Sequence, residues 1–151
     1  MARVLISILG VAALLGAIAA SGDTGKAASR EKYVIILQAG KETHEGMARA
    51  LHALLYAREL KEHGHAIVLV FDGAGTEWAE EWTKPDSTHP LAPAYRKLRD
   101  AGVTEVVCDY CSGAFQVKGK LRERGVPLTA EFDGHPSVAR WVDEGYRLLV
   151  L

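Results

Sequence analysis

Cys108 and Cys111 stand three residues apart in the segment EVVCDYCSGAF, residues 105–115, and they are the only cysteines of the chain. An apolar run precedes Cys108 and a helix-like segment begins near Ser112, which predicts that both thiols lie at a strand-to-helix turn. Free N–H groups at a helix start favour the thiolate, the form that attacks disulfides and forms persulfides. The pattern therefore predicts reactive thiols with a lowered pKa, with a disulfide or two packed, unreactive cysteines as alternatives.

Asp109, between the two cysteines, has the opposite effect on the pKa of the thiols. A nearby negative charge raises the pKa of a thiol, since it disfavours the thiolate. We therefore expect Asp109 to limit the acidity of both cysteines, which argues against a strongly oxidising pair of the thioredoxin kind.

Two histidines could approach the cysteines from separate loops. His44 lies in the loop KETHEG and His135 in DGHPS, and His44 could act as a base for a cysteine thiol. A closed zinc site needs four ligands, and here the sequence offers two sulfurs with histidines on separate loops. We therefore predict no metal and no other cofactor, and a metal site formed by the two cysteines and His135 stays as a weaker alternative.

Three glycines are counted as candidate binding residues because they lie in loops after predicted strands. Gly73 and Gly75 occur in FDGAGT, and Gly40 occurs in the loop after the first strand. A glycine turn that feeds a helix can hold phosphate, but the dinucleotide fingerprint and the Walker lysine pattern are missing. A tight turn is the simpler explanation of these glycines.

The elements that must position these residues alternate between strand and helix. Short apolar runs predict strands at 33–38, 66–72, 103–109, 126–132 and 146–151. Helical spacing with glycine stops predicts helices at 47–64, 77–82, 94–102, 112–125 and 136–145.

This alternation predicts one α/β domain over residues 32–151, a doubly wound, mostly parallel sheet of about five strands with helices on both faces. Pro127 places the fourth strand at an edge of the sheet, because proline cannot donate to a ladder. Right-handed crossovers bring the carboxyl ends of the strands to one edge, where ligands of open α/β sheets bind. The candidate site is therefore predicted at that edge.

The amino-terminal segment differs from the rest in composition. Residues 1–22 form an apolar helix-like stretch whose one early cation is Arg3, typical of a signal peptide or an N-terminal membrane anchor, and 23–31 reads as a linker. We predict export to the periplasm or anchoring to a membrane through residues 4–20. The alternative is a cytoplasmic protein in which the helix is buried or binds a partner.

The net charge excludes one class of partner. The chain has 151 residues and a formal net charge of -1, with lysines and arginines scattered along it. This charge gives no electrostatic case for binding nucleic acid.

Over residues 32–151 the chain resembles the DsrE/DsrF-like family, small α/β proteins of sulfur relay and related thiol chemistry. The resemblance is carried by YVIILQAG, the amphipathic helix after it, GHAIVLVFDGAG, VTEVVCDYCSGAF and the closing GYRLLVL. In sulfur-relay members a cysteine directly after a mid-chain strand carries a persulfide, and Cys108 matches that position. Some relatives have a second cysteine three residues on, as Cys111 is here. The resemblance also implies a trimer or hexamer, with sulfur donor and acceptor proteins as partners.

We therefore expect a sulfur-carrier or thiol-exchange protein, without deciding whether it is an enzyme. Cys108 is the expected persulfide carrier, with an accessible thiol of lowered pKa, and Cys111 is the resolving or modulating thiol. The backbone N–H groups of Ser112 and Gly113 are expected to stabilise the anion, and His135 to lie nearby. The alternative is a non-catalytic module that binds a small ligand or assembles into oligomers, with structural cysteines.

Overall fold

The computed structural model describes residues 30–151. The predicted signal or anchor helix, residues 1–22, and all but the last two residues of the predicted linker lie outside the described residues. Within residues 30–151, no helix combines the length and the apolar composition that crossing a membrane requires.

Five strands and six α-helices make up this part of the chain. The strands are β1 (Lys32–Leu37), β2 (Ala66–Phe71), β3 (Thr104–Cys108), β4 (Leu128–Thr129) and β5 (Arg147–Val150). The helices are α1 (His44–Glu62), α2 (Thr76–Trp82), α3 (Ala92–Asp100), α4 (Asp109–Ala114), α5 (Lys118–Glu123) and α6 (Val138–Asp143), and a 3-10 turn, Gly73–Gly75, precedes α2.

The strands form one sheet in the order β4-β3-β2-β1-β5, and every neighbouring pair is parallel. The predicted five-stranded α/β fold is confirmed. The fourth strand lies at an edge, as Pro127 predicts, but it pairs only through Leu128 and Thr129, so the predicted span of 126–132 is too long.

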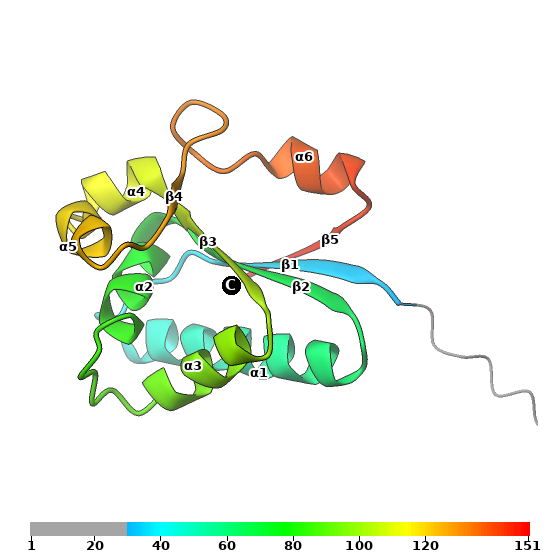
Figure 1. The fold of residues 1–151 in the computed structure, drawn as a ribbon, viewed down its shortest axis with the longest axis horizontal. Helices are drawn as coiled ribbons and strands as arrows, with labels where there is room; N and C mark the ends of the chain where they lie inside the picture. The colour runs from blue at the N-terminus through cyan, green and yellow to red at the C-terminus, as the bar shows by residue number, and fades with distance from the viewer. Residues whose placement is uncertain (1–29) are drawn as a thin grey trace, which may run out of the picture.

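Alternate side chains of the central strands pack into two cores, one on each face of the sheet. Ile35 and Leu37 of β1 belong to the larger core, which α1, α2 and α3 cover, whereas Val34 and Ile36 pack with Trp141 of α6. Figure 1 shows α1 and α3 below the sheet and α6 above it. Because both faces are covered, β1 and β2 are apolar throughout rather than alternating with polar residues.

The predicted helix 112–125 is in fact two helices, and the break lies at Gln116. Gln116 has a φ of 57°, and its N–H donates to the carbonyl of Gly113 at 3.0 Å. The N–H of Val117 donates to the carbonyl of Ser112 at 2.9 Å. These two bonds form a Schellman motif, a helix end that usually carries glycine at the residue with positive φ.

The predicted helix starts differ from the observed ones by one to three residues, and two of these differences bear on the site region. α1 begins at His44 rather than at residue 47, because the Thr43 hydroxyl accepts the N–H of Gly46 at 2.9 Å and so caps the helix there. α4 begins at Asp109, so Cys108 is the N-cap residue and Cys111 lies within the first turn. The cysteine pair therefore straddles the start of α4.

Candidate functional site

Four side chains from segments at or after the ends of three strands meet at the carboxyl edge of the sheet. Cys108 is the last residue of β3, and Asp72 directly follows β2. The register pairs Phe71 with Val107, so Asp72 and Cys108 are the next residues of adjacent strands. His135 comes from the loop after β4, and with Cys111 it completes a group whose ligand atoms all lie within 4.8 Å of one another.

The contacts among these side chains are short. Cys108 Sγ lies 3.2 Å and Cys111 Sγ 3.7 Å from Nδ1 of His135. The Cys111 thiol donates to Oδ1 of Asp72 at 3.2 Å, and the same oxygen lies 4.0 Å from Nδ1 of His135. Both cysteines are free thiols, so the predicted disulfide alternative is not the state described here.

A tight turn places His135. Phe132 and His135 exchange two backbone hydrogen bonds of 2.8 Å, and Asp133 and Gly134 between them have φ values of 47° and 84°. Positive φ at both central residues is the pattern of a type I′ turn, for which Asp-Gly is a favoured sequence. The carbonyl of Gly134 also accepts the N–H of Tyr110 at 3.0 Å, which attaches this turn to α4.

The end of β1 and the residue after it hold Asp72 in position. Its N–H donates to the carbonyl of Leu37 at 3.0 Å, and the side-chain amide of Gln38 donates to Asp72 Oδ2 at 2.9 Å. One carboxylate oxygen is thus held by Gln38 while the other faces the cysteines and His135. Burial alone raises the pKa of Asp72, but hydrogen bonds from Gln38 and from the two cysteines outweigh it and leave the pKa below its usual value.

The prediction of an accessible Cys108 with a lowered pKa is wrong for this structure. Cys108 is 0% exposed and Cys111 is 8% exposed. Burial raises the pKa of Cys108 to about 12, although the N–H of Cys111 donates to Cys108 Sγ at 3.3 Å and acts in the opposite direction. Burial also raises the pKa of Cys111, and its hydrogen bond to Asp72 adds to the effect. The start of α4 does not outweigh the loss of water around the sulfurs.

The sequence predicts that the charge of Asp109 raises the pKa values of the two thiols. In the structure the carboxylate that raises them is Asp72. Asp109 forms ion pairs with Lys118 at 2.6 Å and with Arg122 at 3.2 Å. Hydrogen bonding to Lys118 lowers the pKa of Asp109 itself. The Asp109 charge is therefore compensated by cations on α5.

The other predicted site residues have different positions. Ser112 is fully buried and its hydroxyl donates to the carbonyl of Asp109 at 2.7 Å. The backbone donor that reaches Cys108 Sγ is the N–H of Cys111 rather than that of Ser112 or Gly113. His44 is exposed at the first residue of α1 and is not among the four clustered side chains.

The three glycines have structural explanations. A side chain at Gly75 would begin 1.9 Å from the carbonyl oxygen of Leu37, so only glycine lets the turn pack against β1. Gly73 has a φ of 51°, which favours glycine. A Cβ at Gly40 would lie 2.9 Å from that of Ala74. These contacts support the tight-turn interpretation of this loop region.

Asp72 is the site residue that the sequence reasoning missed. The signal was present, since VFD and VVCD both end apolar strands, and adjacent parallel strands bring such terminal residues together. A cavity of about 370 Å³ lies beside the cluster and is lined by Asp72 and His135 together with mostly apolar side chains, among them Trp141. The arrangement offers two thiols, an imidazole that can accept a proton, and four donor atoms of the kinds that transition metals bind.

Comparison with known proteins agrees with this architecture. The uncharacterised protein MJ0733 of Methanocaldococcus jannaschii is 33% identical over 101 residues, which cover 67% of this chain and 78% of that protein. A conserved protein of unknown function from Bacteroides thetaiotaomicron, BT1422, superposes with a TM-score of 0.53 at 17% identity, over 80% of this chain and 95% of its own, and shares the fold. The model of the DsrE/DsrF-like family matches residues 31–151, and the chain therefore belongs to this family.

Proposed function

We propose that the protein is a sulfur carrier in which Cys108 holds a persulfide. The observation that carries this proposal is the 3.2 Å contact between Cys108 Sγ and Nδ1 of His135. A thiol with a raised pKa is not ionised beforehand, so it needs a base in contact with it when it attacks. His135 is such a base, and membership of a family of sulfur-relay proteins supports the same chemistry.

The transfer step is an exchange without net oxidation. The sulfur of Cys108 attacks the outer sulfur of a donor persulfide, and His135 takes the thiol proton. The donor's sulfur–sulfur bond breaks, the Cys108 persulfide forms, and the proton returns to the departing donor thiolate. Attack by Cys111 on the inner sulfur of that persulfide would then release hydrogen sulfide and leave a disulfide between the two cysteines.

The contacts of the two thiols favour Cys108 as the carrier. Cys111 donates its thiol proton to the carboxylate of Asp72, and this bond holds Cys111 in the protonated form. Cys108 Sγ instead accepts the N–H of Cys111, a contact that favours the thiolate once it forms. Sulfur donor and acceptor proteins, and a trimeric or hexameric assembly, are part of this proposal.

The test is intact mass of reduced, chelator-treated protein after exposure to a low-molecular-weight persulfide. We expect a gain of one sulfur that Cys108→Ser abolishes and Cys111→Ser retains. His135→Gln should slow the gain by about 100-fold or more, the usual contribution of a positioned general base. His44→Gln, a histidine outside the cluster, serves as the matched control and should leave the rate unchanged.

A second candidate function is non-catalytic binding of a small ligand. The observation that favours it is the cavity of about 370 Å³ beside Asp72 and His135. If folded, reduced Cys111→Ser protein, in which the two cysteines cannot form a disulfide, gains no sulfur, the carrier proposal fails and this binding function is the one that the site supports.

A further inference from the structure

Sulfur carriage at Cys108 leaves Asp72 without a direct part in the chemistry. The transfer to Cys108 needs one thiol and one base, and Cys111 acts only afterwards, yet Asp72 and Cys111 also direct donor atoms to the same point. We propose that Asp72, Cys108, Cys111 and His135 bind a zinc ion as a four-ligand site. This inference goes beyond the proposed function, because it does not require that Cys108 carries sulfur.

The distances between the donor atoms fit a four-coordinate ion. Zinc–sulfur bonds of about 2.3 Å and zinc–nitrogen or zinc–oxygen bonds of about 2.0–2.2 Å place the donors of a tetrahedron roughly 3.3–3.8 Å apart. His135 Nδ1 lies 3.2 Å from Cys108 Sγ, 3.7 Å from Cys111 Sγ and 4.0 Å from Asp72 Oδ1. Cys111 Sγ lies 3.2 Å from the same Asp72 oxygen. All four donor atoms lie within 4.8 Å of one another, so movements of up to about 1 Å would bring the whole set to tetrahedral spacing.

The donor types favour zinc over the hard cations. Two thiolates and an imidazole suit zinc, whereas magnesium and calcium prefer a full set of oxygens. Two cysteines separated by two residues are a common pair of zinc ligands. When the ion binds, both thiol protons leave to solvent, the two thiolates balance the charge of the ion, and the carboxylate leaves the site with one net negative charge.

The neighbouring contacts hold the donors in place. The N–H of Cys111 donates to Cys108 Sγ at 3.3 Å, and Gln38 holds the second oxygen of Asp72 at 2.9 Å. The ring of Tyr110 packs on that of His135 with centroids 4.8 Å apart. Hydrogen-bonded ligands of fixed orientation are the usual surroundings of a protein metal site.

A bound zinc ion would have a consequence for the sulfur chemistry. Both thiols would be occupied, so the zinc-bound form and the persulfide form of Cys108 would exclude each other. Zinc would thereby mask the thiols until an acceptor for the metal removed it.

Cobalt(II) substitution tests the site, because thiolate ligation and coordination number both appear in its absorption spectrum. We expect the reduced, metal-stripped full chain to bind one cobalt ion, with a thiolate-to-metal charge-transfer band and the intense visible bands of a four-coordinate ion. Zinc should bleach both. An octahedral spectrum without charge transfer, or no binding, would overturn the proposal.

Variants assign the ligands. Asp72→Asn should weaken zinc binding by at least about 100-fold, since loss of even an outer contact to a metal ligand costs about 10- to 100-fold. Asp143→Asn, an exposed aspartate on α6, is the matched control and should bind as the wild type does. Circular dichroism of each metal-free variant establishes that it is folded. Equal zinc affinity in folded Asp72→Asn would overturn the assignment of the fourth ligand.

The zinc proposal and the sulfur-carrier proposal can be overturned independently of each other. The sulfur measurement is made on chelated protein and the metal measurement on protein never exposed to persulfide. Sulfur gain without metal binding overturns only the zinc site, and metal binding without sulfur gain overturns only the carrier.

Discussion

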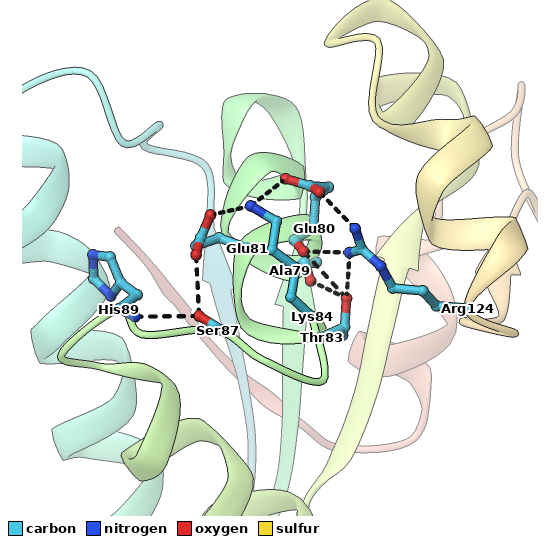
Figure 2. A network of polar contacts seen from close by, with 8 residues as sticks. All are labelled: Ala79, Glu80, Glu81, Thr83, Lys84, Ser87, His89 and Arg124. Atoms are coloured by element: carbon cyan, nitrogen blue, oxygen red, sulfur yellow. Dashed lines mark hydrogen bonds and ion pairs between the residues drawn. The ribbon is translucent and has the colours of Figure 1, made fainter.

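Two carboxylates at different places in the fold, Glu80 and Asp72, are withdrawn from water in different ways. The Glu80 side chain is 3% exposed, and its Oε1 pairs with Arg124 at 2.8 Å while Oε2 lies 3.5 Å from Lys84. Figure 2 shows Arg124 reaching from the end of α5 to the side chains of α2. Asp72 is 23% exposed, and within residues 30–151 no lysine or arginine pairs with it. Its partners are an amide, a thiol and His135.

The difference separates a structural network from a reactive one. At Glu80 two permanent cations compensate the charge, and no proton needs to move. At Asp72, which is only partly withdrawn from water, the partners are groups that exchange protons or bind metals, so chemistry remains available. Buried charge alone therefore does not mark a site, and the type of its partners does.

The largest effect is expected from Arg124→Met. Loss of one partner of a buried ion pair costs about 3–5 kcal/mol, and we expect the lower end because Lys84 still lies near Glu80. Urea unfolding at neutral pH measures this loss. In the Arg124→Met background, Glu80→Gln should restore much of the stability; if it does not, lost packing rather than an unpaired charge explains the effect.

The same pair predicts a pH dependence. Burial raises the pKa of Glu80, but Arg124 and Lys84 outweigh this and hold the pKa below its ordinary value of 4.5. The stabilisation by the ionised Glu80 is therefore complete above pH 4.5 and is lost as the pH falls through the lower folded pKa. The stability difference between wild type and Arg124→Met should shrink in that acidic window.

The fold was predictable where local pattern and tertiary environment agree. The apolar runs of β1 and β2 predict strands buried on both faces, and Pro127 predicts the edge position of β4. The break at Gln116 was not predictable in the same way, because the left-handed residue of a Schellman motif is usually glycine. The buried Val117, packed in the larger core, holds the chain in that turn.

The site was predictable in position and less so in its electrostatics. The carboxyl-edge argument places Cys108, Cys111 and His135 at one end of the sheet. It does not give the burial of the sulfurs, because that depends on the turn from Phe132 to His135 and on its attachment to Tyr110. Asp109 lies next to Cys108 in sequence, but its charge is taken up by Lys118 and Arg122, so the more distant Asp72 acts on the thiols instead.

A smaller effect, on the reactivity of the thiols, is expected from a substitution at Asp72, the second carboxylate of the comparison. Asp72→Asn removes a charge that raises the pKa of both thiols, so the thiolate fraction at a given pH should increase. Alkylation of chelated, reduced protein with iodoacetamide should become faster, by about tenfold for each pKa unit by which the thiol becomes more acidic. Because burial persists, neither thiol should become as reactive as a free cysteine.

Asp109→Asn is the matched control for that experiment. It removes a carboxylate adjacent to Cys108 in sequence, but one whose charge is already compensated by Lys118 and Arg122. The alkylation rate should stay close to that of the wild type. If Asp109→Asn accelerates alkylation more than Asp72→Asn does, the assignment of the acting carboxylate is reversed.

The smallest effect is expected from Arg122→Met, the counterpart of Arg124→Met on the same helix turn. Arg122 is 64% exposed and pairs with Asp109, which keeps its contact with Lys118 after the substitution. Exposed pairs contribute below about 1 kcal/mol, and salt screens them. Urea unfolding at low and high ionic strength should therefore show a small loss that shrinks with salt. A loss as large as that of Arg124→Met would mean that burial of the carboxylate does not decide the strength of these pairs, and the contrast between Glu80 and the exposed pairs would have to rest on another feature of α5.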